Sequence, residues 1–162
     1  MHQEIENVGV QLGRRIIDVM TKDQANVHQT QLDIIKYLCV SFWPYVFGKQ
    51  IDNLKTNNAG TFVLLDQNFK FLGRISSEYR QPGSSNEEAD PSLGYQAAID
   101  RQRTYSYYVV GLIKGALKNL GTALGGKPVK VSMTDLGANS ANSKAAFEVK
   151  IEIILPNIEK SE

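Results

Sequence analysis

The sequence predicts an α+β domain in which helices pack on one face of a twisted, antiparallel, four-stranded sheet. Three observations predict this fold. Long segments carry apolar residues at spacings of three and four, which is typical of amphipathic helices. Four shorter segments alternate apolar and polar residues, as strands with one wetter face do. These strand segments fall in two pairs on either side of a helical segment, an order that favours an antiparallel sheet covered by helices.

The first helix is predicted over residues 3–20. Its apolar residues form one stripe with a 3.6-residue period, made of Ile5, Val8, Leu12, Ile16 and Val19. Val10 and Ile17 form a second, narrower stripe, and Gly9 and Gly13 lie next to the first one. Glycine costs about 1 kcal/mol relative to alanine inside a helix, so two of them indicate a neighbour packed close to the backbone. The helix has more apolar surface than one side requires, and we expect a partner to cover the excess.

A second helix is predicted from about residue 30 to residue 45. Its expected inner face consists of Leu32, Ile35, Leu38, Cys39, Phe42 and Val46. Pro44 cannot donate to the Val40 carbonyl, so we expect a kink or a restart at Trp43 and Pro44. The helical spacing then continues through Ile51 and Leu54, and residues 57–60 end it.

The remaining elements follow in order. A hairpin is predicted with strands at residues 61–65 and 69–75, then a flexible loop at residues 76–101, because its centre has almost no apolar content. A third helix covers residues 103–120, with Gly111 and Gly115 spaced for close approach to the sheet or to another helix. Strands at residues 129–133 and 147–155 complete one domain, residues 1–162, since this length suits a single core.

Composition excludes several classes of function. The chain has 18 Lys and Arg against 17 Asp and Glu, a balance that disfavours a general nucleic-acid binder. One cysteine and two histidines offer no metal cluster and no internal disulfide, so we expect no metal and no other cofactor. No apolar run approaches the ~20 residues of a membrane span, and the N-terminus does not resemble a secretory signal. These features predict a cytosolic protein.

No catalytic constellation emerges from the sequence. A dinucleotide-binding glycine pattern and a Walker loop are both missing. Cys39 lies on the expected inner face of the second helix, and His28 lies in a turn, so they do not suggest a nucleophile and base. We therefore expect no enzyme activity. The alternative to an interaction subunit is a small domain that binds a hydrophobic ligand; a continuous cavity beside Trp43, Tyr105 and Tyr108 would favour it.

Several segments resemble one known family. They are residues 21–23 (TKD), 32–37 (LDIIKY), 42–43 (FW), 48–57 (GKQIDNLKTN) and 111–121 (GLIKGALKNLG). Together they resemble the family of the sixth small subunit of TRAPP, the transport protein particle that tethers vesicles. Residues 49–57 are the most specific part, and the resemblance covers nearly all of the chain from residue 5 to residue 153. The loop at residues 76–101 is longer than is usual in this family.

The resemblance implies a function and partners. It implies a heterodimer with the third small subunit of TRAPP, built from N-terminal helices, within an assembly that tethers ER-derived vesicles at the Golgi and exchanges nucleotide on a Rab GTPase. Exchange is attributed mainly to other subunits, so the chain would be a scaffold. It would be cytoplasmic and peripheral at Golgi and ER–Golgi membranes, with membrane contact only through the complex.

The resemblance and the apolar stripe agree on the partner-binding residues. The expected set lies on the first helix and consists of Ile5, Val8, Gly9, Leu12, Gly13, Ile16 and Val19. Burying the apolar members would contribute roughly 10 kcal/mol before the cost of association, at ~1.5–3 kcal/mol for each side chain. An isolated chain is expected to be able to pair with itself through the same stripe. The third subunit carries an acylated cysteine, but Cys39 is expected to be packed, so acylation is not expected here.

Overall fold

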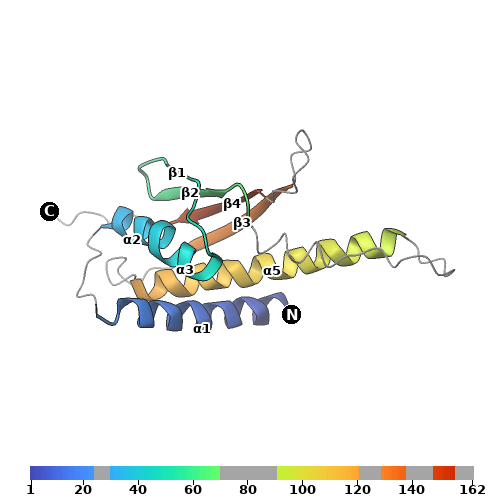
Figure 1. Ribbon diagram of the computed structural model, residues 1–162, viewed down its shortest axis with the longest axis horizontal. Helices are drawn as coiled ribbons and strands as arrows, with labels where there is room; N and C mark the ends of the chain where they lie inside the picture. Colours follow the sequence, from blue (N-terminus) through green and yellow to red (C-terminus); the bar gives the residue numbers. More distant parts are fainter. Residues whose placement is uncertain (24–29, 70–90, 121–128, 138–147, 156–162) are drawn as a thin grey trace.

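The computed structural model describes residues 1–23, 30–69, 91–120, 129–137 and 148–155. In chain order its elements are α1 (His2–Thr21), α2 (Gln31–Tyr37), the π-helix η1 (Leu38–Phe42), α3 (Trp43–Phe47), β1 (Asn53–Thr56), β2 (Thr61–Asp66), α5 (Pro91–Leu120), β3 (Lys130–Gly137) and β4 (Glu148–Ile154). The sheet forms the first layer of the fold. Helices α2, α3 and α5 form the second layer, and α1 lies on the side of α5 that faces away from the sheet (Figure 1).

The four strands pair antiparallel in the order β1-β2-β4-β3. Ile153 in the central strand β4 faces Phe62 of β2 and Val131 of β3. Alternation along β2 places Phe62 and Leu64 in the core. The helices cover one face of the sheet, as Figure 1 shows, so the predicted fold class is confirmed.

The core lies between that face and the helices. Its side chains come from α1, from α2 to α3, from α5, from three strands and from the residue Phe69 after β2, and they include Ile17, Ile34, Ile35, Leu38, Phe42, Trp43, Phe62, Leu64, Phe69, Val109, Ile113, Leu117, Val131 and Ile153. Burial of each large aliphatic or aromatic side chain contributes about 1.5–3 kcal/mol. The middle of α5 is buried on two sides, by this core and by α1.

The second helical segment begins and restarts where the sequence predicts. Thr30 caps α2 with a reciprocal capping box to Asp33. The backbone then widens to π geometry, in which the Trp43 N–H donates to the Leu38 carbonyl five residues earlier, and α-helix resumes with Pro44 in its first turn. One inner-face prediction is wrong, because Leu32 is exposed.

The helix does not continue through Ile51 and Leu54 as predicted. Gly48 has a φ of 77°, a left-handed conformation that ends α3, and its N–H donates to the Pro44 carbonyl at 2.8 Å. Residues 53–56 instead form β1, so the hairpin pairs β1 with β2. The strand predicted at residues 69–75 is not seen at Phe69, and residues 70–75 lie outside the described part of the chain.

The third long helix begins earlier than the sequence predicts. It starts at Pro91 rather than at residue 103, so residues 91–101 are helical and do not belong to a loop. Residues 76–90 of the predicted loop lie outside the described residues, as does His28. The predicted strands at residues 129–133 and 147–155 correspond to β3 and β4.

Candidate partner-binding surface

Helix α1 packs on α5 through four glycines. Gly9 and Gly13 are buried against the main chain of α5, and a Cβ on Gly13 would overlap the carbonyl oxygen of Leu112. Gly111 and Gly115 approach the main chain of α1 in the same way, at Glu6 and Val10. The two helix axes are therefore closer than side chains of ordinary size would permit, and the predicted close neighbour of these glycines is α5.

Polar groups fix the register of this helix pair at both ends. Lys114 forms an ion pair with Glu6 at 2.6 Å, and both side chains are partly buried. Further along, the Asn119 side chain accepts from Arg14 Nε at 3.2 Å and donates to the Asp18 carboxylate at 2.5 Å. Charge-assisted hydrogen bonds depend on direction, so these contacts disfavour sliding or rotation of α1 on α5.

The larger apolar stripe of α1 points away from α5. Val8 is 58% exposed and Val19 is 68% exposed, and Leu12 between them is exposed as well. Ile5 is half-buried, and Ile16, also half-buried, packs against the core. An apolar row of this length on one helix face is typical of a surface that another protein covers.

The seven predicted residues therefore divide into two groups. Gly9 and Gly13 are occupied by α5 of the same chain and do not contribute to the open surface. The narrower stripe packs inward with them, since Ile17 is fully buried and Val10 is half-buried. The other five predicted residues make up what we call the α1 stripe: Ile5, Val8, Leu12, Ile16 and Val19.

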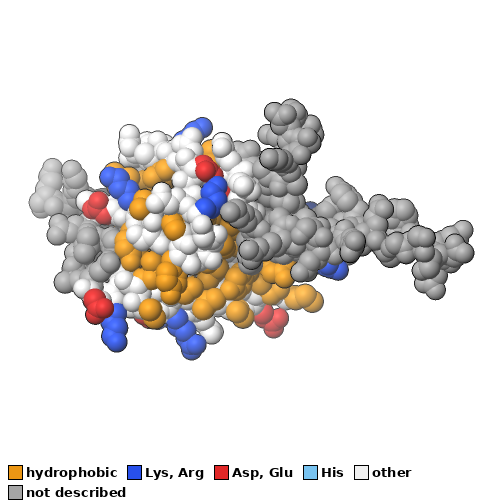
Figure 2. Space-filling view, in the orientation of Figure 1, with side chains coloured by type: hydrophobic (Ala, Val, Ile, Leu, Met, Phe, Trp, Pro, Cys, Tyr) orange, Lys and Arg blue, Asp and Glu red, His pale blue; other side chains and the backbone are white. Residues whose placement is uncertain are grey.

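A second group of exposed apolar residues lies on α2, η1 and α3. Leu32, Val40 and Tyr45 are all exposed, and the Tyr45 side chain is 63% exposed. Figure 2 shows hydrophobic side chains gathered on the visible face over α2, α3 and α1. Sequence reasoning missed this group because it concentrated on the inner face; Val40 and Tyr45 could have been noticed as apolar residues outside that face.

A partly buried charge network links the family-like segment at residues 48–57 to the β1–β2 hairpin. Asp66 is completely buried and accepts from Trp43 Nε1 at 2.9 Å and from Lys49 Nζ at 2.8 Å. Lys49 also pairs with Asp52, which in turn accepts from the Gln67 N–H at 2.8 Å. The network holds the turn after α3 on the β1–β2 hairpin, so its role is structural.

The network shifts the pKa of two of its members. Burial opposes the charged form of Lys49, but hydrogen bonds and charge from Asp52 and Asp66 outweigh it and raise the pKa of Lys49. Burial also opposes the charged form of Asp52, yet hydrogen bonds from Lys49 and Gln67 outweigh it and lower the pKa of that carboxyl.

The described residues offer little for nucleophilic or metal chemistry. Burial raises the pKa of the Cys39 thiol to about 12, so it stays protonated and unreactive. In the described parts of the chain, histidine, cysteine and acidic side chains form no group of three that could hold a metal ion. No helix in those parts is long and apolar enough to cross a bilayer.

Aromatic rings pack around Trp43, where the ligand-binding alternative requires a cavity. Trp43 is fully buried, and its ring centroid lies 4.3 Å from that of Phe47 and 5.6 Å from that of Phe69. A cavity of about 640 Å³ lies elsewhere, between α5 and β3, and Tyr107 lines it rather than Tyr105 or Tyr108. These observations do not favour the ligand-binding alternative.

Comparison with known proteins identifies relatives over most of the chain. The family described as "Transport protein particle (TRAPP) component" matches residues 1–152. Trafficking protein particle complex subunit 6B from Homo sapiens is 37% identical over 118 residues, which are 73% of this chain and 63% of the relative. Subunit 6A from Bos taurus is 32% identical over 117 residues, with 72% of this chain and 62% of the relative covered. The chain thus spans less than two thirds of the length of these relatives.

A solved structure supports the fold. It is titled "Crystal structure of a trafficking protein particle complex subunit 3 from Naegleria fowleri covalently bound to palmitic acid", and it superposes with a TM-score of 0.54 over 96% of this chain and 82% of that one. At 13% identity this likeness shows the fold alone. The match across residues 1–152 shows the family directly: the chain belongs to the TRAPP component family.

Proposed function

We propose that this chain is a non-catalytic scaffold subunit of a TRAPP tethering and Rab-exchange complex in ER-to-Golgi vesicle transport. The single observation that carries the proposal is the exposed α1 stripe, which lies on a helix whose glycine face packs closely on α5. A helix fixed this firmly presents its outer face as a rigid surface, so a partner loses little additional entropy on binding it. The location proposed with this role is cytoplasmic and peripheral at Golgi and ER–Golgi membranes.

The proposed partner is the third small subunit of TRAPP, joined through the α1 stripe. The relatives at 37% and 32% identity are named as subunits of the trafficking protein particle complex, which supports a role in an assembly. Val8, Leu12 and Val19 supply exposed apolar area at the centre of the surface. The exposed group of Leu32, Val40 and Tyr45 extends the apolar surface to α2 and α3, since one helix stripe alone gives marginal affinity.

Leu12→Asp tests the proposal. A carboxylate at the centre of the α1 stripe would be buried without a partner charge, so we expect at least a tenfold weaker association with purified third subunit. Gln11→Asp is the matched control, because Gln11 is exposed on the same helix, about 100° around from Leu12. Each variant is mixed with the third subunit and the mass of the mixture is measured by light scattering. We expect the mass of a heterodimer for Gln11→Asp and not for Leu12→Asp.

The same experiment separates the proposal from its competitors. Equal association of the Leu12→Asp and Gln11→Asp variants with the third subunit would contradict it. Circular dichroism of each variant alone shows whether the fold is intact, which we expect because Leu12 is exposed. A self-dimer of the unsubstituted chain that dissociates when the third subunit is added would support the proposal, since both would use the same face.

A further inference from the structure

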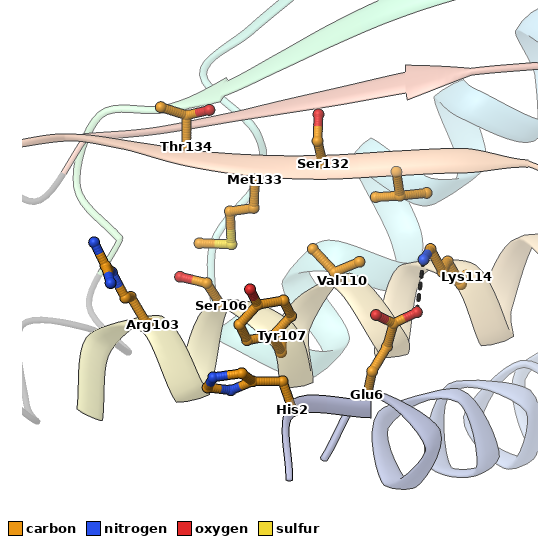
Figure 3. A pocket seen from close by; sticks show the side chains of 11 residues that line it. His2, Glu6, Arg103, Ser106, Tyr107, Val110, Lys114, Ser132, Met133 and Thr134 are labelled. Carbon is orange, nitrogen blue, oxygen red and sulfur yellow. Dashed lines mark hydrogen bonds and ion pairs between the residues drawn. The ribbon is translucent and has the colours of Figure 1, made fainter. Parts of the chain in front are cut away.

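A groove runs between the outer strand β3 and helix α5, and its lining includes none of the α1 stripe residues. Its volume is about 640 Å³, within the range of small-molecule binding sites. Four successive residues of β3 form one wall, Val131 to Thr134, and the N-terminal part of α1 closes one side. Figure 3 shows the Met133 side chain pointing from β3 toward α5, and Arg103 rising from α5 toward β3.

The strand along this groove lies at the edge of the sheet formed by the described residues. β3 is the last strand in the order β1-β2-β4-β3, and among the described residues it pairs with β4 alone. An edge strand presents a row of main-chain N–H and C=O groups that another extended segment can pair with. Four residues of strand span about 13 Å, enough to bind a short peptide in extended form.

The side chains of the groove define which peptide would fit. Val110, Val131 and Met133 supply an apolar surface that is buried or half-buried. Lys114 is already paired with Glu6, so its charge is compensated. Arg103 is exposed on α5, and no described acidic side chain pairs with it.

We propose that this groove binds an extended, acidic segment of a partner protein, which adds as a strand to β3. An apolar side chain of the segment packs on Val110 and Met133, and a carboxylate binds the Arg103 guanidinium. A free small anion would use Arg103 but would leave the strand edge and the apolar surface empty. This inference does not depend on the proposed function, because the groove and the α1 stripe are different surfaces.

The test uses the full chain and a phage-displayed library of random heptapeptides. We expect selected peptides to alternate apolar and polar residues and to contain Asp or Glu, which is typical of strand addition. The selected peptides would then be synthesised with a fluorophore and measured by anisotropy. Failure to select any peptide, or selection of peptides without this pattern, would overturn the proposal.

Substitutions in the chain test the charge. Arg103→Glu should weaken binding of an acidic peptide at least tenfold, and replacement of the peptide's acid by Lys should restore binding to that variant. Arg101→Glu is the matched control, because Arg101 is exposed on the same helix and does not line the groove. Equal losses in the two variants would contradict the proposed contact with Arg103.

N-methylation of the peptide tests the strand pairing. In a strand added to β3, every second peptide N–H group points at β3. Methylation of one of these nitrogens should abolish binding, and methylation of the nitrogens between them should be tolerated. A pattern without this period of two would exclude strand addition. The measurements are repeated on the Leu12→Asp chain, where peptide binding should be unchanged even though association through α1 is lost.

Discussion

Gly13 of α1 lies directly on the main chain of Leu112 in α5, so that a single added Cβ would overlap the Leu112 carbonyl oxygen. The contact explains why two glycines are placed in a helix in which each lowers intrinsic stability. It also determines which face of α1 is left exposed. The α1 stripe is open because Gly9 and Gly13, together with the narrower stripe of Val10 and Ile17, face inward.

Gly13→Ala is expected to destabilise the fold. Alanine would stabilise an exposed helix position by about 1 kcal/mol, so the sign of the change is diagnostic. Here the methyl group must push α1 away from α5, and we expect a net loss of about 1–3 kcal/mol in the free energy of unfolding. Urea titration followed by circular dichroism measures it, with Gln11→Ala as the exposed control. A Gly13→Ala variant that gained stability would contradict the close contact.

Lys49→Met tests the charge network around the buried Asp66. The substitution removes the cation from Asp66, whose carboxylate is completely buried and keeps only its N–H donors. We expect a loss of about 2–3 kcal/mol in the free energy of unfolding, because an uncompensated charge stays buried. Lys55→Met, at an exposed position in β1, should change the same urea midpoint little. Comparable losses in the two variants would show that the network does not stabilise the turn.

The lowered pKa of Asp52 predicts a specific pH dependence. A carboxyl whose pKa is lower in the folded protein contributes stability above its unfolded value of about 4. That contribution is lost as the pH falls through the folded pKa. Asp52→Asn should therefore be less stable than the unsubstituted chain near pH 7, and the difference should shrink toward about pH 2. Urea titrations of both proteins between pH 7 and about pH 2 measure this difference in stability. A difference that does not change with pH would contradict the prediction.

The raised pKa of Lys49 has the opposite sign. Its contribution is complete below the unfolded value of about 10.4 and is lost as the pH rises through the higher folded pKa. The contributions of Asp52 and Lys49 are therefore both complete between about pH 4 and about pH 10.4, a range that includes neutral pH.

The sequence was sufficient to predict the fold class but not which segments form the strands of the sheet. Ile51 and Leu54 continue a helical spacing, yet Gly48 ends the helix before them in a left-handed conformation. A glycine directly after the last helical residue is a recognised stop signal, and here it outweighs the apolar spacing. The start of α5 was missed because the residues just before Pro91 are polar, although Pro91 suits a first helical position and Leu93, Tyr95 and Ile99 follow it.

The candidate surface could be predicted only in part. Periodicity located the α1 stripe, because apolar residues at spacings of three and four lie on one face of a helix. It could not say which of two adjacent stripes packs inward, because that depends on the shape of α5. Gly111 and Gly115 of α5 face α1, just as Gly9 and Gly13 of α1 face α5. This pairing of two glycine motifs is visible only in the packed structure of the two helices.

Protection of a cysteine in the α1 stripe tests the central claim most directly. Val8→Cys places a thiol at an exposed position, while Cys39 stays unreactive because burial raises its pKa to about 12. Gln11→Cys supplies the matched control on the same helix. We expect saturating third subunit to slow maleimide labelling of Cys at position 8 by at least tenfold and to leave position 11 unchanged. Equal labelling rates at position 8 with and without the third subunit would contradict the claim that this partner covers the α1 stripe.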